Sequence, residues 1–430
     1  MNTKIAILLG FLVPATAAFG GTWTLADCLK QAKEKSLSLE TAKLREQKAD
    51  ISVKQAKTGN HPTVSASIQN TLYDHPFVDD GDHYRLSLGI SGSYTIWDGG
   101  ATSLNVEASQ LSKEATALST KQTERSVQES VLNAYMSLLA AMENLRTANA
   151  SVDLAQAEFE HYGKLYEAGS ITKKDLTQSQ SNVLQKQVSQ LSAQLSVNSA
   201  KTSLRQLLEL DESEEFEISA PESNIESPDS LPPLPSLDEL RKVAKESHPG
   251  LKSDSVSVKA AKKNTQVAGK GSSITVTLGA NSSTGLQAWE SDRYGRQLKN
   301  GWQNSVSLGI NIPIIDGGAT DNKVLQAQVT EAETQISMQE TAKNIDNNIE
   351  KLLINAVSAD MQWKAAALQV QAENEALQVA EEQRNAGALT YTDYLTQKNN
   401  LEKAQITQTN AKYTSLLARK MLELYQGKLD

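Results

Sequence analysis

The chain has 430 residues, with 42 Lys and Arg against 51 Asp and Glu, and a single cysteine. The mild negative charge and the lack of a dense basic cluster argue against nucleic acid as a partner, and one cysteine excludes an internal disulfide. Only 39% of the residues are hydrophobic and 5% are aromatic, which is little for one compact core and favours long helices with wide polar faces.

The N-terminus has the pattern of a secretory signal peptide. Lys4 precedes an apolar run over residues 5–13, and small residues follow at 15–18. A basic start, a short apolar middle and an A-x-A exit predict a signal peptide over residues 1–20, which places the mature chain beyond the inner membrane. No later run is long enough to predict a transmembrane helix.

The next part of the chain, residues 21–210, forms the first of two repeats. Its predicted elements are a helix, a β-hairpin over residues 62–97, a long helix over 101–168 and a returning helix over 173–210. In the hairpin, apolar Val64, Ala66 and Ile68 alternate with polar residues, as in a strand with two unlike faces. In the long segment apolar residues recur at steps of three and four without an interrupting proline, which is typical of a coiled coil.

An acidic, proline-rich linker over residues 211–236 separates the two repeats, and its composition indicates irregular chain. Residues 237–427 then repeat the first part. The string Asp-Gly-Gly-Ala-Thr occurs at residues 98–102 and again, 218 residues later, at 316–320. This agreement indicates an internal duplication. The second repeat is therefore predicted to contain a helix, a β-hairpin over residues 273–315, a long helix over 319–386 and a returning helix over 392–425.

The number of strands predicts an oligomer. Each predicted strand is apolar on one side and small and polar on the other, which is typical of strands between lipid and a wet lumen. Four strands cannot close a barrel, for which about eight are the practical minimum, whereas three copies supply twelve. The predicted fold class is an α+β membrane protein, a trimeric β-barrel of twelve strands, four from each protomer, continued by a long α-helical coiled-coil tunnel. The alternative is an amphipathic sandwich domain on a periplasmic coiled coil.

Two motifs, each present in both repeats, resemble those of the TolC-like outer-membrane factors, or outer membrane efflux proteins. One is an apolar-Asp-Gly-Gly turn from a strand into a long helix, at residues 96–100 and 314–318. The other is a glycine turn with a downstream aspartate, at residues 166–175 and 384–393. The resemblance covers almost the whole mature chain. It implies a homotrimer whose linker lies in an equatorial region around mid-tunnel.

The resemblance also implies a function. The chain would be a passive conduit for efflux or type I-type export, set in outer-membrane lipid of a Gram-negative-type bacterium with its tunnel in the periplasm. Its expected partners are a periplasmic membrane-fusion adaptor and an inner-membrane transporter of the RND or ABC type. No cofactor, nucleic acid or enzymatic activity is expected, because the common nucleotide, metalloprotease and serine-hydrolase motifs are missing from the sequence. The competing function is a structural coiled-coil protein or adhesin of the cell surface or periplasm.

The glycine turns supply the first candidate functional residues. The strand-to-helix turns contain Asp98, Gly99, Gly100, Asp316, Gly317 and Gly318. Gly169 and Gly387 are predicted to end the two long helices, because glycine adopts the left-handed conformation there easily. The resemblance places these two turns at an inward-facing tip where adaptors dock, with candidate contacts Ala168, Gly169, Ser170, Ile171, Ala386, Gly387, Ala388 and Leu389.

The resemblance further implies a gate at this tip. It places Asp393 in a ring of acids that narrows the tunnel entrance, where three carboxylates would attract cations and repel anions. The alternative is a solvated surface carboxylate. By position Asp175 should face Arg384 across the two helix pairs, and we predict a salt bridge between them. A second latch of the family falls on Lys174 and Leu389, which form no obvious polar pair.

One predicted loop contains several residues of types that bind metals. This loop is the tip of the first hairpin, with His75, Asp79, Asp80, Asp82 and His83. A solvated hairpin tip explains the same residues, so we expect no metal.

Overall fold

The structure of the chain is a computed structural model, and its two compact units each contain parts of both repeats. The predicted signal peptide and the loop with the five potential metal ligands lie outside the described residues, which are 22–72, 84–211, 216–219, 227–287 and 294–428. The first unit comprises Met1–Glu40, Thr123–Glu246 and Asp346–Asp430. The second unit comprises Thr41–Gln122 and Ser247–Ile345.

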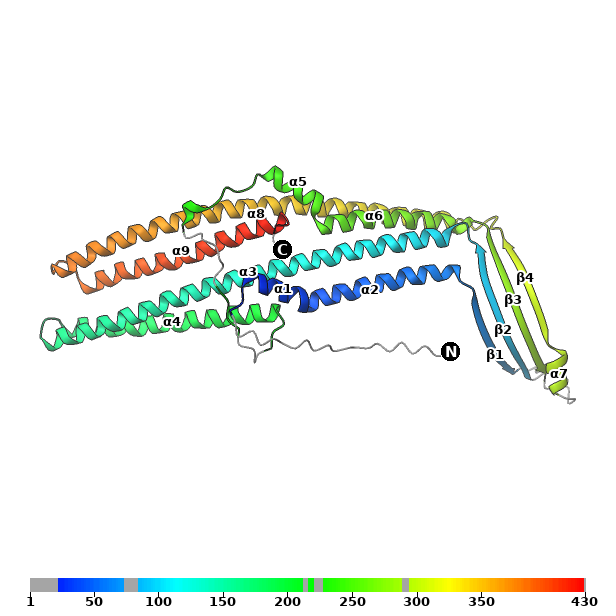
Figure 1. Cartoon of the computed structure of the whole chain (residues 1–430), viewed down its shortest axis with the longest axis horizontal. Helices are drawn as coiled ribbons and strands as arrows, with labels where there is room; N and C mark the ends of the chain where they lie inside the picture. Colours follow the sequence, from blue (N-terminus) through cyan, green and yellow to red (C-terminus); the bar gives the residue numbers. More distant parts are fainter. Residues whose placement is uncertain (1–21, 73–83, 212–215, 220–226, 288–293, 429–430) are drawn as a thin grey trace. The chain divides into compact units, whose positions relative to one another are not determined.

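The second unit contains a four-stranded antiparallel sheet (Figure 1). The strands lie in the order β1 (Thr63–Leu72), β2 (Tyr84–Trp97), β3 (Thr275–Gln287) and β4 (Gln303–Asn311). The first two come from the first repeat and the last two from the second, so the pairing of β2 with β3 joins the repeats. The predicted four strands per copy are confirmed.

The two faces of this sheet differ in polarity, because side chains alternate along each strand. The register pairs Ile68 with Leu88 and Leu278 with Leu308, so the apolar residues share one face. Serine, threonine and glycine residues occupy much of the other face. The apolar face is uncovered in the single chain, where Ile68 is 74% and Leu308 62% exposed. A face of this kind needs an apolar environment.

Four of the helices directly precede or follow the strands in the chain. They are α2 (Leu37–Lys57), α3 (Ala101–Glu167), α6 (Pro249–Ala268) and α8 (Ala319–Asn385). In the second unit α3 contacts α2 through Lys113 and Asp50, whose charged atoms lie 2.7 Å apart, and α6 through Glu107 and Lys263 at 2.6 Å. A short helix, α7 (Tyr294–Asn300), precedes β4 and was not predicted.

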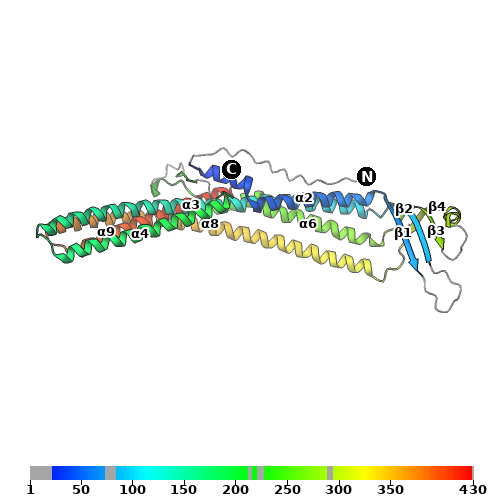
Figure 2. The same ribbon diagram turned by 90° about the horizontal axis from the view of Figure 1, so that it is seen from below.

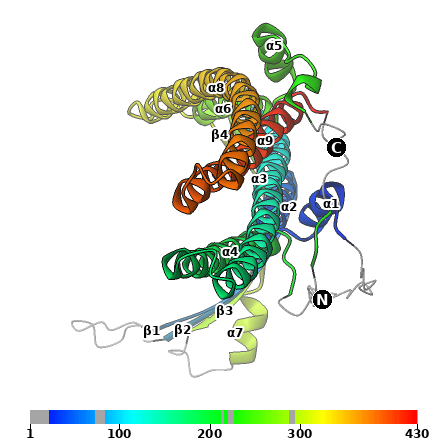
Figure 3. The ribbon, with the colours of Figure 1, turned by 90° about the vertical axis from the view of Figure 1, so that its left-hand side faces the viewer.

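The first unit is built from helical hairpins. Its further helices are α1 (Leu25–Lys35), α4 (Lys173–Leu207), α5 (Leu237–Ser247) and α9 (Tyr391–Tyr425). The α3–α4 and α8–α9 turns lie at the same end of this unit (Figures 1 and 3), and α3, α4, α8 and α9 lie side by side there (Figure 2). None of the described helices is both long and apolar enough to cross a membrane.

The apolar core of the first unit joins α1, α3 and α4. Its most buried members are Cys28, Val131, Leu132, Tyr135, Leu204, Leu208 and Phe216. The hydroxyl of Tyr135 donates to the carbonyl oxygen of Ser219 at 2.6 Å, which ties the start of the linker to α3. Burial raises the pKa of the Cys28 thiol to about 12, so this cysteine is a neutral core residue.

The described part of the linker is held by charged side chains of α8 and α9. Lys364 of α8 pairs with Asp229 at 2.8 Å. Arg419 of α9 donates to the carbonyl oxygen of Pro232 at 2.7 Å and pairs with Asp360 of α8 at 2.6 Å. The proline-rich segment therefore has defined contacts despite its irregular backbone.

Candidate functional site

The strand-to-helix turns of the two repeats have the same geometry. The carboxylate of Asp98 accepts hydrogen bonds from the amides of Gly100 at 2.9 Å and Thr102 at 2.7 Å. Asp316 accepts the equivalent bonds in the second repeat at 2.9 and 2.8 Å. Each carboxylate therefore caps the free amides at the start of a long helix. The glycines after these aspartates all have positive φ angles, namely Gly99, Gly100, Gly317 and Gly318.

Gly99 and Gly317 provide a matched test of these turns. Both have a left-handed backbone, which costs an alanine about 1 to 2 kcal/mol, but a Cβ on Gly99 would also lie 2.3 Å from the Cβ of Ser273. A Cβ on Gly317 meets nothing within 4 Å. We expect Gly99→Ala to lower the thermal unfolding midpoint of the purified protein clearly more than Gly317→Ala. Equal midpoints by circular dichroism would mean that Ser273 moves aside without cost.

The two tip turns end the long helices as predicted for glycine. Gly169 has φ +71° and Gly387 has φ +74°. The amide after each glycine bonds back into the last helical turn, from Ser170 to the carbonyl of Leu165 at 2.9 Å and from Ala388 to that of Gln383 at 2.8 Å. This is the bonding of a Schellman cap, in which the left-handed residue satisfies the last carbonyl groups.

Most of the candidate tip residues are exposed. The exposed ones are Ala168, Gly169, Ser170, Lys174, Ala386, Gly387, Ala388 and Asp393. Ile171 and Leu389 are only half-exposed, because both pack against a cluster of tyrosines. The exposed turn thus consists of small side chains, with two apolar residues anchored beneath them.

Asp175 and Asp393 each cap the returning helix that they begin. The Asp175 carboxylate accepts from the hydroxyl of Thr172 at 2.7 Å, and the Asp175 amide donates to that hydroxyl at 3.3 Å. Asp393 and Thr390 make the same two contacts at 2.6 and 3.2 Å. In the first repeat the Thr172 amide also donates to the Asp175 carboxylate at 3.2 Å, which completes a capping box; the T-x-x-D motif itself is visible twice in the sequence.

The predicted salt bridge between Asp175 and Arg384 is missing from the described residues. Arg384 instead donates a hydrogen bond to the hydroxyl of Tyr162. Its guanidinium carbon lies 4.4 Å from the ring centre of Tyr394, 5.1 Å from that of Tyr162 and 5.4 Å from that of Tyr391. The prediction is wrong because the Asp175 carboxylate serves its own helix cap, while aromatic faces hold the guanidinium by cation–π attraction.

These three tyrosines, Tyr162, Tyr391 and Tyr394, form what we call the tyrosine cage. Tyr162 comes from α3 and the other two from α9, and the ring centres of Tyr162 and Tyr391 lie 4.5 Å apart. Burial raises the pKa of Tyr162 to about 12, although the Arg384 charge opposes this shift. Burial likewise raises the pKa of Tyr391 and Tyr394. The cage is therefore uncharged at neutral pH.

The cage brings together residues that the sequence analysis did not combine. Tyr391 and Tyr394 are spaced three apart at the start of α9, so their side chains share one helix face. That spacing is a visible signal, but the position of Tyr162 opposite them depends on how α3 meets α9. The cage and Arg384 therefore connect α3, α8 and α9 close to the tip.

Comparisons with known proteins give a family model and a set of similar folds. A family model described as outer membrane efflux protein matches residues 28–209 and 240–428. No curated protein matches the chain significantly.

Several solved structures share the fold across 94% of this chain. The structure of CusC is 17% identical with a TM-score of 0.79, and 91% of that chain is covered. VceC from Vibrio cholerae is 18% identical with a TM-score of 0.73 and 97% coverage. The open state of the MtrE outer membrane channel of Neisseria gonorrhoeae is 18% identical with a TM-score of 0.75 and 88% coverage.

Proposed function

The chain belongs to the outer membrane efflux protein family, and we propose that three copies of it form one gated export duct. The protein is an outer-membrane efflux channel, with a β-barrel in the membrane and a helical tunnel in the periplasm, and its family is not one of enzymes. The finer proposal is that the helical tips dock to a periplasmic membrane-fusion adaptor. An inner-membrane transporter of the RND or ABC type would then supply the energy.

The four-stranded sheet is the observation that carries this proposal. Within the described residues β1 pairs only with β2, and β4 only with β3, so both outer edges have free backbone amides and carbonyls. Free edges are costly in lipid, where a sheet is stable only as a closed barrel. Pairing of β4 in one copy with β1 in the next closes such a barrel, and three copies provide about twelve strands, within the usual range.

Helix α4 supports the same assembly in the periplasm. Leu184, Val188, Leu191 and Leu195 recur at intervals of three and four and are 58% to 65% exposed. An apolar stripe with this spacing is typical of a coiled-coil seam. In the trimer it would pack against a helix of the neighbouring copy and extend the barrel as a tunnel.

The tip would serve for docking and gating. The small exposed side chains around Gly169 and Gly387 leave room for an adaptor to approach the backbone closely. Exposed Asp393 would line the entrance as a ring of three carboxylates that favours cations. Arg384 in the tyrosine cage would hold the two hairpins of each copy together when the tip is closed.

Conductance in planar bilayers tests the channel. We expect discrete, cation-selective current steps from the purified trimer, and a lower cation-to-anion permeability ratio for Asp393→Asn. Asp175→Asn is the matched control, because it removes the equivalent helix cap of the other repeat. A cation-to-anion permeability ratio at the wild-type level in both variants would mean that Asp393 does not line the entrance. No conductance from folded, trimeric wild type would favour the structural coiled-coil or adhesin function.

A further inference from the structure

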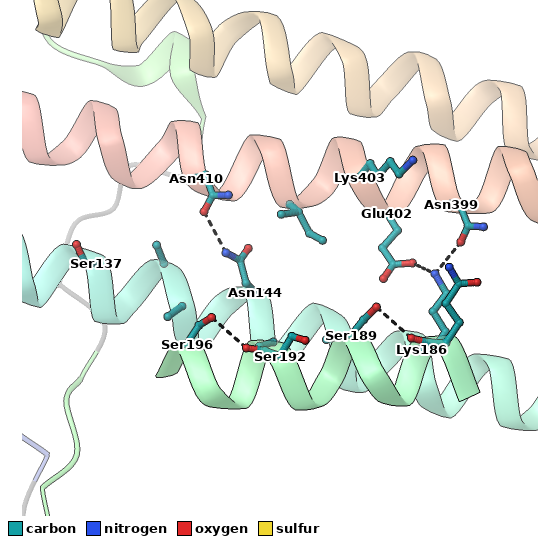
Figure 4. A pocket seen from close by; sticks show the side chains of 16 residues that line it. Ser137, Asn144, Lys186, Ser189, Ser192, Ser196, Asn399, Glu402, Lys403 and Asn410 are labelled. Carbon is teal, nitrogen blue, oxygen red and sulfur yellow. Dashed lines mark hydrogen bonds and ion pairs between the residues drawn. The ribbon is translucent and has the colours of Figure 1, made fainter. Parts of the chain in front are cut away.

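A groove of about 670 Å³ separates α9 from the α3–α4 hairpin in the first unit (Figure 4). Many of its lining side chains are small, among them Ala141, Ala148, Ser192 and Ser196. Small side chains bury little apolar surface, so the packing of α9 against α3 and α4 contributes little stabilisation along this stretch. Along the groove itself, the contact between the hairpins therefore depends on the residues at its two ends.

Polar residues of α9 contact the α3–α4 hairpin at both ends of the groove. Asn410 accepts a hydrogen bond from the side chain of Asn144 on α3 at 3.0 Å. Towards the other end, the ammonium group of Lys186 on α4 donates to Asn399 at 2.7 Å and pairs with the carboxylate of Glu402. Figure 4 shows Lys186 reaching both of these α9 residues.

A second ion pair lies one turn away on the same helix. Lys398 of α9 pairs with Glu158 of α3 at 2.6 Å, and Glu158 also accepts from the hydroxyl of Tyr394 at 3.2 Å. The four charged side chains of the two pairs are only 11% to 15% exposed. Water therefore screens these pairs much less than it screens pairs at an open surface.

The two pairs have opposite polarity. Helix α9 presents a positive residue, Lys398, to α3 and a negative residue, Glu402, to α4. A buried charge that loses its partner is strongly destabilising, because neither water nor another charge replaces the lost interaction. Sliding of α9 that keeps these charges buried would leave them unpaired, so we expect the two pairs to form and break together.

We propose that these four residues, Glu158, Lys186, Lys398 and Glu402, form a lock that holds α9 to the α3–α4 hairpin in the closed channel. The inference rests on the proposed channel function and assigns to it positioning residues outside the tip turns. Opening of the duct requires both pairs to break. The small-residue groove is the part of the interface that yields once they have broken.

Charge reversal tests the lock. Lys186→Glu and Glu402→Lys each place two like charges together, and each is expected to raise the open fraction in planar bilayers roughly tenfold. The double variant Lys186→Glu/Glu402→Lys restores opposite charges and should return the open fraction to within about threefold of wild type. Asp153→Lys is the matched control, since Asp153 is an exposed carboxylate of α3, five residues before Glu158 and not among the groove-lining residues, and its reversal should leave opening unchanged.

A second readout does not depend on conductance. Cysteines introduced by Asn144→Cys and Asn410→Cys should form a disulfide quickly under mild oxidation, because the native side chains are in contact. Native Cys28 does not interfere, since its thiol is buried and its pKa is raised to about 12. Adding Lys186→Glu should slow the cross-link several-fold, and adding Glu402→Lys as well should restore its rate.

The two readouts separate the lock from the channel. The lock is overturned if single reversals in folded trimers leave both opening and cross-linking at the wild-type level. It is also overturned if the double variant stays as open as the single ones. If Lys186→Glu slowed the cross-link and Glu402→Lys restored its rate, but no variant conducted, the result would support the lock and contradict the channel function.

Discussion

Leu308→Arg should prevent stable assembly in the outer membrane, whereas Ser307→Arg should not. Leu308 lies near the middle of β4 on the apolar face of the sheet, and Ser307 points to the opposite, polar face. An arginine that faces lipid near the bilayer midplane costs about 2 to 4 kcal/mol, and a trimer incurs this cost in every copy. On the lumen side the same charge remains hydrated.

The amount of heat-resistant trimer in outer-membrane fractions measures this difference. Because Ser307 and Leu308 are neighbours on one strand, the two variants share their local backbone, their strand position and their added charge. Assembly of both variants at the wild-type level would mean that the apolar face of β4 does not contact lipid. Loss of heat-resistant trimer in both variants would mean that β4 tolerates an arginine on neither face.

Arg384→Leu should open the tip. The substitution removes the cation from the tyrosine cage and the hydrogen bond to Tyr162, and so weakens the contact of α8 with α3 and α9. A half-exposed cation–π contact contributes about 1 kcal/mol, and the trimer contains three such cages. We therefore expect a severalfold higher open probability in planar bilayers, with unchanged single-channel selectivity.

Arg384→Lys is the graded control for this variant. An ammonium group still lies over aromatic faces but lacks the planar fork of the guanidinium, so its effect should fall between wild type and Arg384→Leu. Asp175→Ala should have less effect on opening than Arg384→Leu, because the described structure assigns its carboxylate to the cap of α4. If Asp175→Ala opened the channel more, the ion pair expected from the family resemblance would be the gate contact after all.

The elements of this fold could be predicted because their signals are local and occur twice. Alternation in the strands and steps of three and four in the helices follow directly from the geometry of each element. The duplicated Asp-Gly-Gly string then placed the strand-to-helix turns, where both aspartates cap the helix that follows. The short helix α7 escaped prediction because its polar residues show no apolar periodicity.

The contacts at the tip were harder to predict, because they depend on which faces of distant helices meet. Positional resemblance paired Asp175 with Arg384, but it contained no information on the competing partners of either side chain. Thr172 was a competitor visible in the sequence, since it lies three residues before Asp175. Tyr162, which accepts from Arg384, was not visible as a partner, since α3 and α8 come from different repeats.

The order of pairing in the sheet has a consequence for biogenesis. β1 with β2 and β3 with β4 are hairpins of neighbouring segments, which can form soon after each repeat leaves the inner membrane. The central pairing is different, because β3 follows β2 only after the rest of the first repeat and the linker, so Trp97 of β2 meets Val276 of β3 late in translocation. Closing so long a loop is slow, and during the delay the inner edge of β2 is open to wrong partners. Periplasmic chaperones that shield strand edges should therefore matter most for this chain in the interval between translocation of its first and its second β-hairpin.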